Sequence, residues 1–303
     1  MRKYIKFLMV LFCSMQLHAE TWHRIGIQVE TGYHTWRGSS YSDKSNGVLT
    51  NIGGIWEWRE NHFLSQVGIG CRYVFNSISN MPYEGEFPNM IDTDNDICVY
   101  QYRITDKQDI MHTIHVTPHF LVGGQWNYVY FLVGVKFPIA VYGVNNTKGY
   151  LETSGKYDNL IVPLQAMNNH YFVQQYALSN QLSTYNMGYI GDFLLASEFG
   201  IEIPHDKYIP ISSLHVRHRL AVYMDFGVAM MSKRYKEPLI DFNLSNNRIE
   251  NIDFQSIVIQ PLLASNIQSV KKLHPISIGL KWTMLIELPK SVRCKCLNSY
   301  INY

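Results

Sequence analysis

The sequence predicts an all-β protein: a closed antiparallel up-and-down transmembrane β-barrel of about eight strands with long extracellular loops. Three observations lead there. The first residues form the pattern of an export signal, and apolar residues alternate with polar ones along most of the remaining chain. In addition, only 17% of the 303 residues are charged, while 14% are aromatic, with 21 Tyr. A water-soluble domain is about 25% charged, so this composition favours a chain that meets lipid.

The N-terminal segment is typical of a secretory signal peptide. Basic residues at Arg2, Lys3 and Lys6 precede the apolar run 7–13, and Leu17-His18-Ala19 offers a cleavage site before Glu20. The apolar run is far shorter than the roughly 20 residues that cross a bilayer as a helix. No later apolar run is long enough either, which excludes a helical membrane protein. The bulky Phe12 before Cys13 argues against lipidation. We therefore expect a signal peptide at 1–19, a barrel at 20–290 and a short periplasmic tail at 291–303.

The first four predicted strands show a period of two residues. Residues 24–36 place Ile25, Ile27 and Val29 on one face and Gln28 and Glu30 on the other. A second strand ends near residues 56–58, and a third follows over 63–75. The fourth, 113–122, alternates isoleucine, valine and phenylalanine with threonine and histidine. Each has one apolar and one mixed face, as expected of strands between two environments.

Four more alternating segments follow, at 129–137, 193–202, 220–228 and 278–287. Val222, Met224 and Phe226 oppose Tyr223 and Asp225 in the third of them. The eight segments are each near the 9–11 residues that cross an outer membrane at a tilt. Because strand edges cannot be left open in lipid, such a sheet must close. A soluble sandwich or lipocalin-like barrel with its apolar face inward is the alternative.

The lengths of the connections favour the membrane fold. Short links are predicted at Arg59–Asn61 and Gly124–Asn127, as for periplasmic turns. His205–Arg217 is longer than a periplasmic turn should be, which counts against the scheme. Soluble β proteins seldom carry several long structureless loops. The segments expected to form external loops are Arg37–Asn46, Ser77–Ile110, Gly143–Ile190 and Ser232–His274.

The mixed face of the strands carries charges of both signs. Burying them in a soluble core would cost several kcal/mol each unless they were paired. Inside a narrow barrel they can face one another as a hydrated network, which predicts a filled interior without ion selectivity. The predicted interior network comprises Glu30, Glu57, Arg72, Lys136, Glu198, Asp225 and Lys281, and Arg24 lies on the same face.

No residue pattern predicts catalysis, a metal or a cofactor. Asp92–Asp96 begins like a calcium loop, but Ile97 occupies the position that needs glycine, so a solvated acidic loop is the better interpretation. His115 and His119 share a face with threonines and predict an interior hydrogen-bonding row. Cys71, Cys98, Cys294 and Cys296 do not form a disulfide framework, and the last two have no clustered partners to complete a zinc site. No nucleophile-elbow motif is present.

Two stretches carry a family resemblance. Residues 116–142, VTPHFLVGGQWNYVYFLVGVKFPIAVY, and 277–296, SIGLKWTMLIELPKSVRCKC, are similar to outer-membrane β-barrel proteins of Bacteroidota-type bacteria, broadly of the OmpA transmembrane type. The resemblance implies the fold and an outer-membrane location and transfers no catalytic residue. Many relatives continue into a peptidoglycan-binding domain; this chain ends a few residues after Cys296, so that domain is not expected.

These observations give one main functional hypothesis and two alternatives. The main hypothesis is an outer-membrane barrel with a structural or binding role, in contact with outer-membrane lipid and able to bind a surface ligand or protein through its loops. The net charge of +2 does not point to nucleic acid. An outer-membrane hydrolase or acyltransferase would need a Ser/His/acid cluster at the rim. A soluble secreted β protein would need the opposite arrangement of the two faces.

Overall fold

The computed structural model describes residues 21–37, 42–92, 95–157, 176–183, 189–204, 216–232, 238–242, 247–249, 255–265 and 273–288, together with Asn186 and Asp253. The expected signal peptide and the expected tail lie outside these residues. Nearly all described residues belong to β-strands, which confirms the all-β prediction. No helix among the described residues has the length and apolar character needed to cross a membrane.

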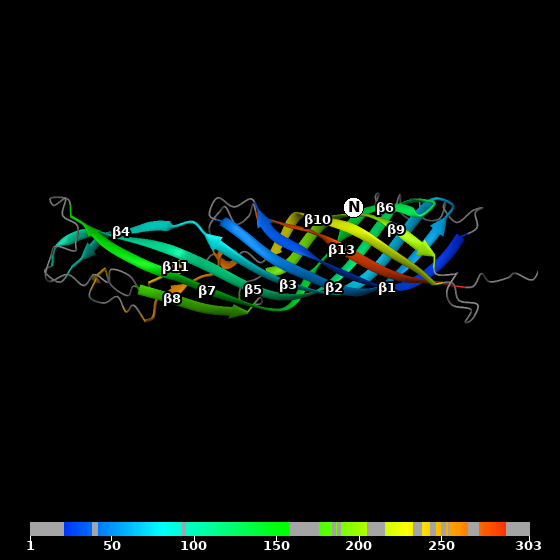
Figure 1. Ribbon diagram of the computed structural model, residues 1–303. Coiled ribbons are helices and arrows are strands. Elements are labelled where there is room, and N and C mark those ends of the chain that lie inside the picture. The colour runs from blue at the N-terminus through cyan, green and yellow to red at the C-terminus, as the bar shows by residue number, and fades with distance from the viewer. Residues whose placement is uncertain are drawn as a thin grey trace, which may run out of the picture.

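Eight strands pair edge to edge in a closed ring (Figure 1). Every neighbouring pair is antiparallel, and the ring closes where β1 pairs with β13 and β13 pairs with β10. In the order in which they pair, the ring strands are β1 (Thr21–Arg37), β2 (Ser42–Glu60), β3 (Phe63–Asn80), β5 (Ile97–Trp126), β6 (Val129–Lys136), β9 (Tyr189–Pro204), β10 (Val216–Ser232) and β13 (His274–Glu287).

The register of the ring follows the alternation in the sequence. Glu30 lies opposite Lys281 on one side and Asn51 on the other, so polar side chains from three strands meet inside. The backbones approach closely where Gly32 pairs with Gly279. A Cβ at Gly32 would lie 2.8 Å from the Tyr223 hydroxyl, so glycine is needed for this interior packing.

The two short turns predicted from the sequence are confirmed. The β2–β3 turn contains Asn61 and the β5–β6 turn contains Asn127, with φ angles of 52° and 54°. Asparagine tolerates this left-handed backbone better than most residues, which explains its position in both turns. Both turns lie at the same end of the ring as the start of β1, and we call this the turn end.

Beyond the other end of the ring the sheet continues as a long projection (Figure 1). β5 is 30 residues long, and its first half pairs with β4 (Tyr83–Ile91) and with β7 (Ile139–Lys156). β7 also pairs with β8 (Tyr176–Ser183). We call β4, β8 and the parts of β5 and β7 that they pair with the extension.

The extension corrects the prediction of structureless loops. Ser77–Ile110 contains the end of β3, all of β4 and the first half of β5, and Gly143–Ile190 contains most of β7 and all of β8. Arg37–Asn46 is also largely strand, and apart from the 8-residue β6 the ring strands run from 14 to 30 residues. The sequence analysis missed this because the alternation in the extension uses tyrosine and polar residues, which resemble an exposed loop.

A second layer covers one face of the extension. It comes from Ser232–His274, whose described residues form only β11 (Ile240–Asp241), β12 (Val258–Ile259) and the short 3-10 helix η3 (Leu262–Ala264). This layer contributes six residues to an apolar core shared with β4, β5, β7 and β8, and these are Leu239, Ile240, Phe242, Ile249, Ile257 and Ile259. The extension therefore has its own hydrophobic core outside the ring.

The segment 257–265, which we call the cap, closes the end of the ring nearest the extension. Leu262 and Leu263 are buried with Trp36, Met111 and Tyr189. The Leu262 N–H donates to the Asp109 carboxylate at 2.9 Å, and Lys107 Nζ lies 2.6 Å from the same side chain. The cap is thus held by a buried charge pair as well as by apolar packing.

Candidate functional site

The structure places all seven residues of the predicted interior network, and Arg24, inside the ring with exposed fractions of 3% or less. The residues that alternate with them face outward and are apolar. On β10, for example, Asp225 is 1% exposed whereas its neighbour Met224 is 50% exposed. Charged side chains are almost never fully buried in soluble proteins unless they are paired, so the contacts among these residues decide how they are tolerated.

Most of the predicted residues meet in a central cluster. Lys136 Nζ lies 3.1 Å from a Glu30 oxygen and 3.0 Å from an Asp225 oxygen. Arg72 donates to Asp225 at 3.1 Å. These four residues come from β6, β1, β10 and β3, so the cluster spans the interior of the ring.

Lys281 and Glu198 extend the central cluster. Lys281 Nζ lies 2.7 Å from Glu198 and 3.6 Å from Glu30. Glu198 also accepts a hydrogen bond from the Tyr130 hydroxyl, and Asn51 donates to Glu30 at 3.0 Å. Three cations and three carboxylates therefore balance one another in the cluster, and each has at least one charged partner.

Glu57 lies apart, in a second cluster towards the turn end. Arg24 donates to Glu202 at 3.0 Å and to Glu287 at 2.9 Å. Arg219 is bound to both Glu57 and Glu202, and its guanidinium stacks 4.5 Å from the Tyr130 ring centre. The structure does not bring Glu57 into contact with the central cluster through a direct ion pair.

The sequence analysis did not single out Arg219, Glu202 or Glu287 as members of the network. Arg219 precedes the predicted strand 220–228 by one residue, and the strand in fact begins at Val216. Glu202 and Glu287 are the last residues of their predicted strands. The signal was present in each case, because all three continue the polar face of an alternating segment.

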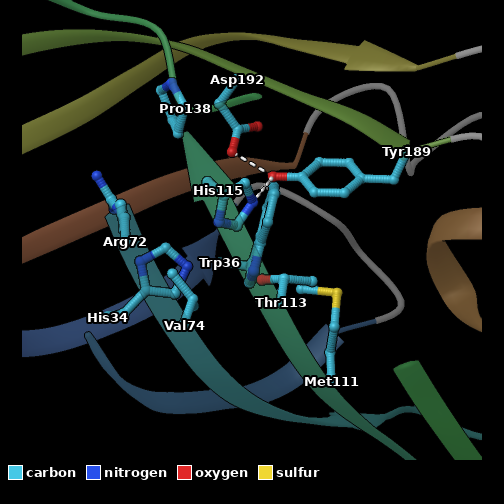
Figure 2. Close-up of a pocket in the computed structure, with 10 residues that line it drawn as sticks. All are labelled: His34, Trp36, Arg72, Val74, Met111, Thr113, His115, Pro138, Tyr189 and Asp192. Atoms are coloured by element: carbon cyan, nitrogen blue, oxygen red, sulfur yellow. Dashed lines mark hydrogen bonds between the residues drawn. The ribbon is translucent and has the colours of Figure 1, made fainter. Parts of the chain in front are cut away.

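Near the cap, His34, His115 and Tyr189 line a small cavity of about 10 Å³, room for about one water molecule (Figure 2). The Tyr189 hydroxyl donates to Asp192 and lies 3.5 Å from His115 Nε2. His115 and His119 are both buried, and the described residues contain no group of three or more metal-binding side chains. The cavity holds no room for an organic substrate.

One serine and histidine do lie in contact. His34 Nδ1 is 2.9 Å from the Ser277 hydroxyl, which also accepts a hydrogen bond from Arg72. Both side chains are buried inside the ring beneath the cap. Within the described part of the chain, the Nε2 atom of His34 has no hydrogen-bond partner. The pair is therefore placed to support Arg72 and not to attack a substrate at the rim.

The remaining cysteines and acidic residues carry no further site among the described residues. Cys71 and Cys98 are free thiols, and Cys294 and Cys296 lie outside the described part of the chain. In the segment that begins like a calcium loop, Asp92 accepts hydrogen bonds from the Asp96 N–H and the Tyr157 hydroxyl. These bonds occupy oxygens that a calcium ion would need.

Comparison with known proteins does not assign the chain to a family. No protein-family model matches the chain, and no curated protein matches it.

Proposed function

We propose that this chain is an outer-membrane protein whose ring is a closed transmembrane β-barrel with a filled interior. The extension stands at the cell surface and has a structural or binding role there. The observation that carries the proposal is the polarity of the ring, which is apolar outside and charged inside. Water would favour the reverse arrangement, whereas lipid favours this one.

Large exposed apolar side chains lie on the outside of seven of the eight ring strands, and the outward apolar residues of β5 are half-buried. A soluble monomer seldom exposes an apolar patch larger than a few hundred Å². The outward side chains occur on neighbouring strands at matching heights, and the band that they form is too extensive for an isolated patch. Exposed members include Ile25, Ile27, Val48, Ile52, Val67, Ile69, Phe131, Val133, Leu195, Phe199, Leu220, Val222, Met224, Phe226, Ile278 and Leu280.

Aromatic residues border the band. Trp56, Trp126 and Tyr128 are exposed near the turn end, and Tyr33 and Tyr73 are exposed near the extension. Aromatic girdles of this kind lie at the two interfaces of membrane barrels. Trp56 lies opposite Ile25 on β1, and the eight residue steps from there to Tyr33 span roughly 20 Å along the barrel axis, taking about 3.3 Å per residue and a tilt of about 40°. That height is close to the roughly 25 Å apolar band of such barrels.

The two ends of the ring suggest its orientation. The short β2–β3 and β5–β6 turns share one end with the start of β1, and the extension leaves from the other end. Outer-membrane barrels have short turns on the periplasmic side and long loops on the extracellular side. The proposed partners are therefore outer-membrane lipid around the band and a surface ligand or protein at the extension.

The two alternative functions have weaker support. A soluble secreted protein would bury the apolar band and expose Asp225, whereas the described residues do the opposite. A hydrolase would need an accessible nucleophile, but the Ser277 hydroxyl and His34 are buried beneath the cap.

A spin label tests the membrane proposal. We expect a label at Met224, introduced by Met224→Cys in a background in which Cys71, Cys98, Cys294 and Cys296 are replaced by Ala, to be accessible to dissolved oxygen and shielded from a polar relaxant in lipid vesicles. The physical reason is that Met224 points outward at the height of the apolar band.

The matched control is Lys148→Cys, on the exposed face of the extension, where the polar relaxant should dominate. A shift between unheated and heated samples on a gel would show that each variant is folded. If the label at Met224 is protected from both relaxants in a protein that stays dissolved without detergent, the proposal is wrong.

A further inference from the structure

The turn end of the ring contains an open cleft of about 320 Å³. Its walls come from the starts of β1 and β10, the end of β13, and the end of β2 with its turn. The residues that line it are Trp22, Arg24, Arg59, Asn61, Arg217 and Glu287. Three of the six are arginines, and Glu287 is the only acid among them.

The carboxylates near the cleft are already engaged by other arginines. Glu287 accepts from Arg24 at 2.9 Å and from Arg217 at 3.1 Å. Glu202 is bound by Arg24 and Arg219. These acids therefore have little remaining capacity to neutralise another cation.

Arg59 differs from the other arginines at this end. Its Nε donates to the Asn61 carbonyl at 2.9 Å, and within the described residues no carboxylate lies at ion-pair distance from its guanidinium. An anion bound in the cleft would supply the ion-pair partner that Arg59 lacks among the described residues.

The local count of charges supports the same conclusion. Among the described inward-facing residues at this end, the cations are Arg24, Arg59, Arg217 and Arg219, and the carboxylates are Glu57, Glu202 and Glu287. Among these described residues the cations exceed the carboxylates by one.

We propose that this cleft binds one phosphate group, with Arg59 as its principal ligand and Arg217 beside it. A guanidinium presents two parallel N–H groups that match two phosphate oxygens, and such charge-assisted bonds are among the strongest hydrogen bonds in proteins. The phosphate can come from a lipid headgroup or from a soluble phosphate ester. The lipid source rests on the proposed function, because Trp22 and Trp56 would place the cleft at headgroup height only in a membrane.

The test is a calorimetric titration of the full chain in a non-ionic detergent. One arm uses inorganic phosphate, a second uses a short-chain phosphatidylglycerol, and a third uses the matching diacylglycerol, which lacks the phosphate. We expect Arg59→Gln to weaken phosphate-dependent binding by about 10- to 100-fold, the loss of one charge-assisted interaction. Arg59→Lys should restore part of it, whereas Lys148→Gln, which removes an exposed charge from the extension, should leave it unchanged.

The three ligands distinguish the possible sources of the phosphate group. Binding of the phospholipid alone identifies a headgroup site, and binding of both phosphate compounds identifies a general phosphate site. Equal affinity for the phospholipid and the diacylglycerol, or unchanged affinity in Arg59→Gln, overturns the inference. If that happens while the Met224 label still reports lipid, the cleft proposal fails and the membrane proposal stands.

Discussion

At the scale of single residues, the stability of the ring depends on how its buried charges are paired. Lys281 and Glu198 lie 2.7 Å apart and are both almost completely buried. Removing one member of such a pair leaves the other charge without compensation in a medium of low dielectric constant. Removing both replaces an ion pair with neutral groups and leaves no stranded charge.

We therefore predict strong coupling between these two positions. Lys281→Met alone should lower the free energy of unfolding by about 3 to 5 kcal/mol. The double variant Lys281→Met/Glu198→Gln should lose less than the sum of the two single variants. Urea unfolding in lipid vesicles, followed by tryptophan fluorescence, measures all four proteins. Strict additivity would contradict a direct pair, and Lys148→Met provides the control for loss of a surface lysine.

Sequence reasoning could find the charged residues but not their partners. Alternation places Glu30, Arg72 and Lys136 on one face of their strands wherever the register lies. Which of them meet depends on how eight strands close and how far each is displaced along its neighbour. Glu57 illustrates the limit, because its strand and its face were predicted while its partner Arg219 was not.

At the scale of the element, the strands of the extension are the part of the fold that the hydropathy pattern did not predict. In the first half of β5 the buried Cys98, Tyr100 and Ile104 share one face, which is covered by the second layer, whereas Val99, Gln101 and Arg103 lie on the other face. The cover comes from a segment more than 100 residues further along the chain, beyond the reach of a local pattern. The ring strands were easier to predict because apolar and polar residues alternate along each of them.

The extension should be labelled from outside the cell. We expect Lys148→Cys, in the background in which Cys71, Cys98, Cys294 and Cys296 are replaced by Ala, to react with a membrane-impermeant maleimide on intact cells, because Lys148 is exposed on β7. Asn61→Cys, in the β2–β3 turn, should react only after permeabilisation. The reversed pattern would show that the ring has the opposite orientation.

The core of the extension should also respond to alkaline pH. Burial raises the pKa of Tyr100 to about 12, well above the usual value of about 10. Because the folded pKa lies above the unfolded one, the stabilisation is fully present below about pH 10 and is lost as the pH rises through about 12. The change corresponds to about 2 to 3 kcal/mol.

Urea unfolding at pH 9 to 12 checks this expectation. Tyr100→Phe cannot ionise at this position, so it should lose less stability over that interval than the wild type. Tyr102, whose pKa is also raised to about 12 by burial, remains in both proteins. Its ionisation contributes to the stability that the variant still loses at high pH. Identical pH profiles would show that Tyr100 is not held in an apolar core.

At the scale of the whole molecule, three successive layers of residues block the passage of water and ions along the axis of the ring. The cap covers the end beside the extension, the central cluster fills the middle, and Arg24 and Arg219 with their carboxylates occupy the turn end. Every layer is held by contacts between different strands. Opening one layer alone would leave the other two in place.

For the transmembrane barrel proposed above, this arrangement predicts that the ring does not conduct ions. In planar bilayers the wild-type protein should show no large, steady conductance, because the interior charges are paired with one another and leave no continuous water path. Glu30→Ala/Lys136→Ala removes one cation and one carboxylate from the middle layer without changing the net charge. The cap and the turn-end cluster should still block this variant. Large steady conductance in the wild type would show that the paired charges line a channel, and the filled interior would have to be abandoned.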